Sequence, residues 1–204
     1  MTSDNAGKVL YTLMSLVAKL KGVPRDGWNR GARQVASAES VADHSYGTMM
    51  LAMVFPHLVS GMDLDHLALM SICGVHDLVE AKTGDINIYV ARNPAERARL
   101  REEKAHLEKT AIREMRAELG DDIGWFIFDL WVRFEKSDSV EAKIARELDK
   151  IEVAFQALWY FQQGHQIDPW EFFQTARQAV STPELVQFLD REILPKLPKR
   201  GGGK

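Results

Sequence analysis

Apolar residues recur at helical spacing along almost the whole chain, and this pattern constrains the fold most strongly. Near the start they stand at positions 9, 10, 13, 16, 17 and 20, and a later stretch repeats the spacing at 144, 148, 151, 155 and 158. Intervals of three and four residues place side chains on one face of a helix. We find no convincing alternation of apolar and polar residues of the kind that predicts a strand. The sequence therefore predicts an all-α protein.

Glycine, proline and capping residues divide this pattern into separate helices. We expect helices at 8–21, 40–59, 64–82, 94–119, 122–136, 139–163, 169–180 and 183–193. Two connections are longer and chemically richer than ordinary helix links, and such loops often carry function: Gly22 to Glu39 and Thr83 to Pro94. We expect residues 1–7 to be disordered, 8–194 to form one domain, and 195–204 to be a flexible C-terminal tail.

Composition narrows the class of partner and the compartment. With 204 residues and 46% hydrophobic content, the chain can bury one substantial core. A net charge of -3 gives no long-range attraction for polyanions, so we expect no nucleic-acid polymer as partner. The chain has neither a signal-peptide pattern nor an apolar run of the roughly 20 residues that span a bilayer, so we expect no membrane association. The single cysteine, Cys73, fits a reducing compartment, and we expect a cytoplasmic protein.

The segment from Ile123 to Trp131 is hydrophobic on more than one face of a helix. Such a helix lies either at the centre of a core or in a contact between subunits, and the sequence does not choose between them. We expect a homodimer.

A charged pair interrupts an apolar segment in the first half of the chain. His76 and Asp77 lie within the run Leu67 to Glu80, which is otherwise mostly apolar. A buried carboxylate without a partner carries a large desolvation cost, so this pair implies a compensating cation. A bound metal ion is the simplest such cation.

Side chains from other helices must complete the coordination of this ion. The best candidates are His44, on a helix with an apolar face, and Asp149, beside the apolar stripe of a later helix. Two imidazoles and two carboxylates without a thiolate favour one divalent ion such as Mn²⁺, Co²⁺, Mg²⁺, Fe²⁺ or Zn²⁺. An ion with open positions activates water and polarises a phosphoryl oxygen, which favours hydrolysis.

The order of these residues resembles a known family. The segment Glu-Ser-Val-Ala-Asp-His44, followed by His76-Asp77-x-x-Glu80-x-x-x-Gly-Asp85 and then Asp149, looks like the HD-domain metal-dependent phosphohydrolases. More narrowly it resembles the HD-domain 5′-deoxynucleotidases, and the resemblance covers roughly Leu10 to Gly164. The resemblance implies an HD-type helical bundle with the metal held between helices. It also implies a small nucleotide as the substrate.

Site roles follow from this resemblance position by position. It implies that His44, His76, Asp77 and Asp149 ligate the metal, and that Glu80 and Asp85 transfer protons and position the attacking water or the substrate. In the family, an arginine and a tryptophan in the loop after the first helix hold the phosphate and the sugar, and the counterparts here are Arg25 and Trp28. Arg30 and Arg33 are alternatives for the phosphate role. The spacing independently places Glu80 on the helix face of His76 and Asp77.

Other interpretations of the same residues stay open. Asp85 after Gly84 also suits a turn or a cap, Trp28 also suits a hydrophobic lid, and Glu80 also suits a solvated face. Some HD proteins are di-iron oxygenases with two further histidines before the last aspartate. Here that interval holds only His106, within a mixed-charge segment typical of a solvated helix face, so the oxygenase interpretation is disfavoured.

The sequence thus predicts an enzyme that removes the 5′-phosphate from deoxynucleoside or nucleoside monophosphates. An alternative is an HD phosphohydrolase acting on a nucleoside triphosphate or on a modified or biosynthetic nucleotide. A second alternative, from another class, is a nucleotide-sensing HD module without turnover.

Overall fold

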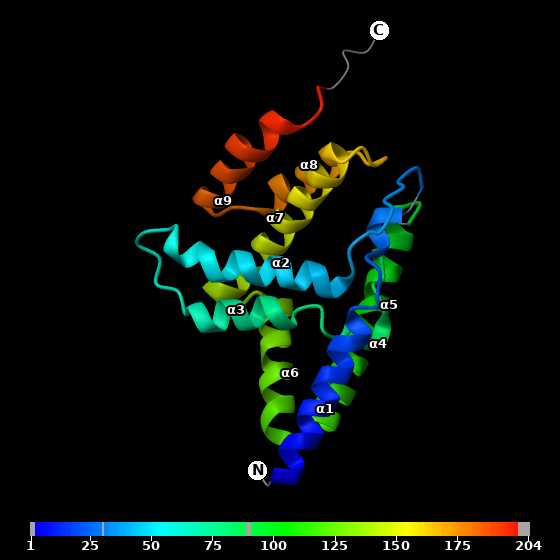
Figure 1. Cartoon of the computed structure of the whole chain (residues 1–204), viewed down its shortest axis with the longest axis vertical. Helices are drawn as coiled ribbons and strands as arrows, with labels where there is room; N and C mark the ends of the chain where they lie inside the picture. The colour runs from blue at the N-terminus through cyan, green and yellow to red at the C-terminus, as the bar shows by residue number, and fades with distance from the viewer. Residues whose placement is uncertain (1–2, 30, 89–90, 200–204) are drawn as a thin grey trace.

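The computed structural model describes residues 3–29, 31–88 and 91–199, and its regular structure in these ranges is helical (Figure 1). In chain order the elements are α1 (Ser3–Leu20), η1 (Asp26–Asn29), α2 (Val41–Val54), η2 (Phe55–His57), α3 (His66–Val75), α4 (Glu80–Thr83), α5 (Pro94–Leu119), α6 (Asp121–Lys136), α7 (Val140–Gln162), α8 (Pro169–Ala179), α9 (Pro183–Phe188), the π-helical turn η4 (Leu189–Ile193) and η5 (Leu194–Lys196). Within the described ranges, β-structure is limited to the isolated bridges Pro24–Ser40 and Gln34–Gln166. The all-α prediction is confirmed.

Capping side chains fix where the long helices begin. Ser40 caps α2 through a reciprocal pair of bonds with Asp43, and Asn93 caps α5, whose first residue is proline. Ser139 accepts a bond from the amide of Ala142 at the start of α7. These side chains satisfy amide groups that have no partner inside the helix. The predicted starts at 40, 94 and 139 therefore agree with the structure to within a residue.

Helix α7 forms the centre of the larger core and packs against α2, α3, α6 and α8. Its buried residues include Leu148, Ile151 and Leu158, which belong to one cluster with apolar side chains of α2, η2, α3, α6, α8, α9 and η4. A second core lies between α1, α5 and α6, and α1 runs beside α5 in Figure 1. Helices α2 and α3 lie side by side above it. The site described below lies where these two cores meet, because α2, α3 and α7 belong to the first and α4 joins the second.

The predicted helix 64–82 is broken, which corrects the sequence interpretation. Helix α3 ends at Val75, a tight turn follows, and the short helix α4 begins at Glu80. Through this turn the backbone bonds shorten to i→i−3, as from the Leu78 amide to the Val75 carbonyl and from Glu80 to Asp77. The regular i→i−4 hydrogen bonds of the helix are interrupted at His76 and Asp77. The spacing of the apolar residues continues across this segment, so it did not reveal the break.

Both ends of the chain also differ from expectation. Helix α1 begins at Ser3 rather than at 8, and the predicted helix 183–193 is α9 followed by a π-helical turn. Leu197, in the predicted tail, is buried against the larger core. The start at Ser3 was missed because residues 3–7 are polar or small and carry no apolar period.

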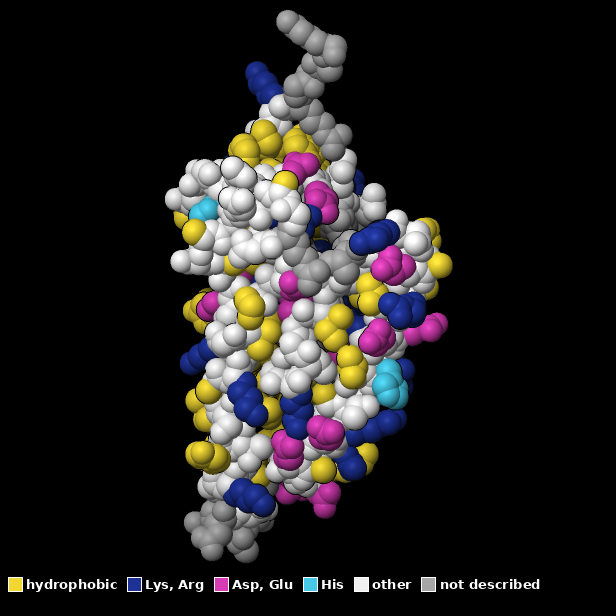
Figure 2. Space-filling view, turned by 90° about the vertical axis from the view of Figure 1, so that its right-hand side faces the viewer, with side chains coloured by type: hydrophobic (Ala, Val, Ile, Leu, Met, Phe, Trp, Pro, Cys, Tyr) yellow, Lys and Arg dark blue, Asp and Glu magenta, His cyan; other side chains and the backbone are white. Residues whose placement is uncertain are grey.

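Helix α6 resolves the question raised by its hydrophobic sequence. Ile127, Leu130 and Trp131 are buried, whereas Trp125 and Phe126 expose about half of their surface at 49% and 54%. The helix is therefore a core element with an additional exposed aromatic edge. On the face seen in Figure 2, basic and acidic side chains are interspersed, consistent with the small net charge. Among the described residues, no helix combines the length and hydropathy needed to cross a bilayer.

Candidate metal centre and active site

Three of the predicted side chains, His44, His76 and Asp77, bring ligand atoms within 4.8 Å of one another, and Asp149 contacts His44 beside them. The Nε2 atom of His44 lies 3.2 Å from Asp149 Oδ1, 3.7 Å from Asp77 Oδ2 and 3.4 Å from His76 Nε2. His76 Nε2 is itself 3.3 Å from Asp77 Oδ2. Ligand atoms that each lie about 2.0–2.2 Å from one divalent ion are separated by distances of this order. The His44, His76 and Asp77 donors could therefore hold one ion, and Asp149 lies next to this group through its contact with His44.

Neighbouring groups orient both imidazoles with Nε2 toward this site. The Nδ1 atom of His76 lies 2.7 Å from the Cys73 carbonyl oxygen, which can only accept, so Nδ1 carries the proton. The Nδ1 atom of His44 lies 2.6 Å from Glu152 Oε2. A neutral imidazole that donates from Nδ1 presents a lone pair on Nε2, which is the form that binds a metal.

The electrostatics of the cluster call for positive charge. Burial and Arg25 oppose protonation of His44, but its hydrogen bonds to Asp149 and Glu152 outweigh them and raise its pKa to about 10. Burial likewise opposes ionisation of Asp149, yet Lys150 and His44 hold the pKa of its carboxyl well below its usual range. The acidic groups thus stabilise a cation at the Nε2 position, and a divalent ion would supply that charge.

Arg25 and Asp85 lie together beside the cluster, held by the two long loops. The Arg25 guanidinium donates to Asp77 Oδ2 at 3.2 Å and lies 3.8 Å from Asp85 Oδ2. Asp85 also accepts a bond from the backbone amide of Asp26, at the start of η1. Gly84, with φ at +71°, turns the chain out of α4 just before Asp85, a conformation that favours glycine. Asp85 therefore joins the loops as a cap while facing Arg25.

Glu80 is buried, and its two carboxyl oxygens differ in their hydrogen bonding. Its Oε1 lies 3.2 Å from Lys104 Nζ, whereas Oε2 is buried without a hydrogen-bond partner within the described part of the chain. Burial raises the pKa of Glu80 to about 9, Asp77 and Asp85 add to the rise, and Lys104 opposes it. An oxygen of this kind is free to exchange a proton with a bound molecule.

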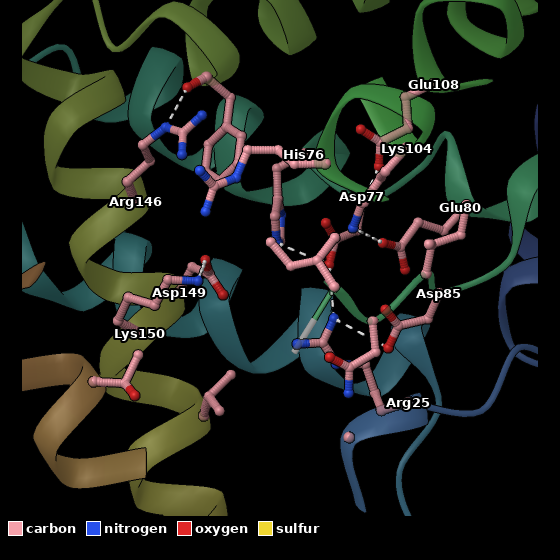
Figure 3. Close-up of a pocket in the computed structure, with 18 of the residues that line it drawn as sticks. Arg25, His76, Asp77, Glu80, Asp85, Lys104, Glu108, Arg146, Asp149 and Lys150 are labelled. Carbon is pink, nitrogen blue, oxygen red and sulfur yellow. Dashed lines mark hydrogen bonds and ion pairs between the residues drawn. The ribbon is translucent and has the colours of Figure 1, made fainter. Parts of the chain in front are cut away.

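These groups line one cavity of about 500 Å³, a size typical of small-molecule sites. Figure 3 shows Asp77 near its middle, with Arg25 and Asp85 on one side, Glu80 and Lys104 on another, and Asp149 beyond His76. His44 is fully buried behind them.

The structure places Trp28 less openly than the sequence suggests. Its side chain is only 2% exposed, and its Nε1 donates to Glu39 Oε1 at 3.0 Å. The ring packs against Tyr160 and Phe172 in a third, small core. Trp28 still lines the cavity, so a contact with substrate would be limited to a small part of the indole.

Arg33 and Arg30 were the alternatives to Arg25 for binding the phosphate. Arg33 lines the cavity, but it donates to the Gly27 carbonyl, pairs with Glu171 and lies over the ring of Phe172. These contacts tie the first loop to α8. Arg30 lies outside the described residues.

Several cavity residues were not predicted. Lys104 and Glu108, one turn apart on α5, face the cavity and lie 3.4 Å from each other, although their mixed-charge segment suggested a solvated face. His106 does lie on the exposed side of that helix. Phe172 belongs to α8, beyond the end of the segment that carries the motif. The four-residue spacing of Lys104 and Glu108 was the available signal, but nothing local showed which side of α5 is covered.

Comparison with known proteins gives matches over most of the chain. A family model described as HD domain matches residues 17–186. The 5′-deoxynucleotidase HDDC2 of Xenopus laevis is 34% identical over 187 residues, covering 91% of this chain and 87% of the relative. The protein of that name from Homo sapiens is 31% identical, covering 92% of this chain and 86% of the relative.

Solved structures share the arrangement of helices. A protein from Pyrococcus horikoshii superposes with a TM-score of 0.68 at 25% identity, covering 90% of this chain and 96% of its own. An HD-domain phosphohydrolase from Listeria innocua superposes with a TM-score of 0.70 at 18% identity, covering 95% of this chain and 90% of its own. At that level of identity, the second match supports the fold alone.

Proposed function

Because this chain belongs to the HD domain family, we propose that it is a metal-dependent phosphohydrolase that removes the 5′-phosphate from deoxynucleoside or nucleoside monophosphates. One observation carries the proposal: three proposed metal ligands, a buried Glu80 oxygen that has no hydrogen-bond partner among the described residues, and an arginine all belong to the lining of one cavity of about 500 Å³. The relatives named 5′-deoxynucleotidase support the choice of a monophosphate.

We assign the metal to His44, His76, Asp77 and Asp149. Nitrogen and oxygen donors without sulfur suit Mn²⁺, Co²⁺, Mg²⁺, Fe²⁺ or Zn²⁺. A divalent ion bound there lowers the pKa of a water molecule and polarises a phosphoryl oxygen. The chain's own contribution is to hold both imidazoles in the Nδ1-protonated form, through the Cys73 carbonyl and Glu152.

Glu80 and Arg25 act on the substrate in this proposal. Glu80 exchanges a proton at Oε2 while Lys104 holds Oε1, so only one oxygen is available and its direction is fixed. Arg25 is oriented by Asp77 and Asp85 and offers its remaining donors to the phosphate. Asp85 thus positions Arg25 and joins the two loops, and Trp28 supplies part of the wall around the sugar.

Release of inorganic phosphate from a panel of nucleotides tests the function. The purified protein is supplied in turn with Mn²⁺, Co²⁺, Mg²⁺, Fe²⁺ and Zn²⁺, and with deoxynucleoside and nucleoside mono- and triphosphates. Phosphate from monophosphates supports the proposal. Release of tripolyphosphate or pyrophosphate from triphosphates, nucleotide binding without turnover, or iron-dependent oxygen uptake would each contradict it in favour of another HD activity.

We also propose that the protein is a homodimer. Trp125 and Phe126 on α6 expose about half of their surface, and exposed aromatic residues of this kind often lie in subunit contacts. Light scattering coupled to size exclusion should give twice the chain mass of 23.1 kDa. A mass of one chain at micromolar concentration would rule out the dimer. The cytoplasmic location stays a prediction.

A further inference from the structure

Glu152 contacts the face of His44 that points away from the other ligands. Its Oε2 lies 2.6 Å from His44 Nδ1, while His44 Nε2 faces Asp149, Asp77 and His76. Glu152 does not line the cavity. We propose that Glu152 is a positioning residue for the metal centre: it fixes the rotation and the tautomer of His44 so that the Nε2 lone pair points at the ion. This inference rests on the proposed metal ligation by His44.

A glycine makes room for this contact. A Cβ atom at Gly47 would lie 2.8 Å from Glu152 Oε1, closer than real Cβ contacts come, and 3.1 Å from its Cγ, which is also tight. Gly47 lies on α2, three residues after His44, so both residues face α7. Without a side chain at 47, α2 and α7 approach closely enough for the carboxylate to lie between them. A larger residue at 47 must shift the Glu152 side chain, whose other carboxyl oxygen contacts His44.

The two histidines are held differently, which gives Glu152 a specific effect. His76 Nδ1 donates to a neutral backbone carbonyl, whereas His44 Nδ1 donates to a carboxylate. A carboxylate partner makes the imidazole a stronger electron donor to a metal than a carbonyl does. Glu152 also lies on α7 three residues after Asp149, so one helix both supplies a ligand and orients a ligand on α2.

A competing possibility is that Glu152 is itself a ligand. Glu39, His44 and Glu152 each offer a ligand atom within 4.8 Å of the others, as a second ion would require. The 2.6 Å contact argues against this, because Nδ1 is already bonded to the carboxylate. Glu39 in turn accepts from Trp28 Nε1. The number of ions bound per chain distinguishes the two possibilities.

The test measures Mn²⁺ binding to the metal-free, full-length protein by calorimetric titration, together with the unfolding temperature of the metal-free form. Four variants are compared with the wild type: Glu152→Ala, Glu152→Gln, Gly47→Ala and, as a matched helical control, Gly7→Ala. A Cβ at Gly7 has no neighbouring atom within 4 Å. The Gly47 variant keeps the carboxylate and removes only the room for it, so it does not depend on the folding of the Glu152 variants.

We expect Glu152→Ala and Gly47→Ala each to weaken Mn²⁺ binding by about 10- to 100-fold, the usual effect of removing such a partner. Glu152→Gln, whose amide oxygen still accepts from Nδ1, should recover part of this loss, and Gly7→Ala should match the wild type. The metal-free Gly47→Ala protein should still unfold in one cooperative transition, which would show that weaker binding does not come from loss of the fold. Unchanged affinity in Glu152→Ala and Gly47→Ala, or two ions per chain of which one is lost with Glu152, would overturn the inference. Failure of the wild type to bind any ion would instead overturn the proposed function.

Discussion

His44 and Asp149 are held by α2 and α7, the helices that build the larger core, whereas Arg25 and Asp85 are held by loops and by each other. We call the first two residues, together with the other proposed ligands His76 and Asp77, the helix side of the site, and we call Arg25 and Asp85 the loop side. On the helix side, His44 is fully buried and its orientation depends on contacts within the core. On the loop side, the two key residues lie 60 positions apart along the chain and meet only because Asp85 caps η1.

This difference indicates how the work of the site is divided. The helix side shares its packing with the core, so its geometry is as well determined as the fold itself. On the loop side, Arg25 and Asp85 are oriented by polar contacts, such as that of Arg25 with Asp77. We therefore expect changes on the helix side to abolish metal binding, and changes on the loop side to alter substrate handling with the metal retained.

The largest effect is expected from Asp77→Ala, which removes a proposed ligand and the partner of Arg25 at once. The variant should lose the metal, and phosphate release should fall by about 1,000-fold or more, because a metal ion supplies several kcal/mol of transition-state stabilisation. Elemental analysis and phosphate release measure the two outcomes. Asp63→Ala, at an exposed position, is the control. Full metal content in Asp77→Ala would remove it from the ligand set.

Glu80→Gln tests whether Glu80 acts in proton transfer or binds the metal. Glu80 is the first residue of α4 and directly follows the turn that carries the proposed ligands His76 and Asp77. Turnover should fall by about 100- to 10,000-fold, the range for a lost general acid or base. Because Glu80 is not assigned as a ligand, the metal content should stay at the wild-type level. If the variant loses its metal as well, Glu80 belongs with the ligands rather than with proton transfer.

Arg25→Ala tests the loop side, and Arg25→Lys is its matched comparison. Removing the guanidinium should lower kcat/KM by about 100-fold, the usual cost of losing one charged donor to the transition state. Lysine keeps the charge without the fork and should recover part of the loss. Metal content should be unchanged in both. Equal rates in wild type and Arg25→Ala would mean that another cation binds the phosphate.

The smallest effect concerns α5, which neither side contains, and it appears as a dependence of stability on pH. Burial raises the pKa of Glu108 to about 7 from an ordinary value of 4.5, with Lys104 opposing the rise. The folded state therefore holds a proton that the unfolded state releases between these values. The contribution of Glu108 to stability is full below pH 4.5 and is lost as pH rises through 7.

Glu108→Gln should remove this slope, so that wild type loses about 1–3 kcal/mol relative to the variant over that pH range. Urea unfolding of the metal-free proteins at a series of pH values provides the measurement. Glu102→Gln, on the exposed side of the same helix, is the control. Parallel stability curves for wild type and Glu108→Gln would show that Glu108 is not buried as a neutral acid.

The helix side could be predicted from the sequence because its signals are local. His76 and Asp77 stand in an apolar segment, and His44 and Asp149 lie beside apolar stripes, so their burial follows from periodicity. The capping residues Ser40 and Ser139 marked the helix starts in the same way. The family resemblance then supplied the grouping of the four, which no local pattern contains.

The rest depended on tertiary contacts. Lys104 lies in a mixed-charge segment that suggested a solvated helix face. The sequence of α5 alone does not show which side of the helix other segments cover, and Lys104 in fact pairs with the buried Glu80. Trp28 was interpreted as a residue that holds the sugar, whereas Glu39 and Tyr160, from separate segments, enclose most of its ring. Glu152 drew no attention because its role requires the close approach of α2 at Gly47. In each case the deciding neighbour is distant in sequence.

The tightened turn between α3 and α4 makes the site intolerant of any change in length. His76 and Asp77 sit at its start and Glu80 at its end, joined by backbone bonds of the i→i−3 type. Inserting or deleting one residue here would rotate Glu80 by about 120° relative to the other two, since i→i−3 bonds give about three residues per turn. We therefore expect a one-residue insertion or deletion at this joint to disrupt the site more than a substitution at an exposed position does.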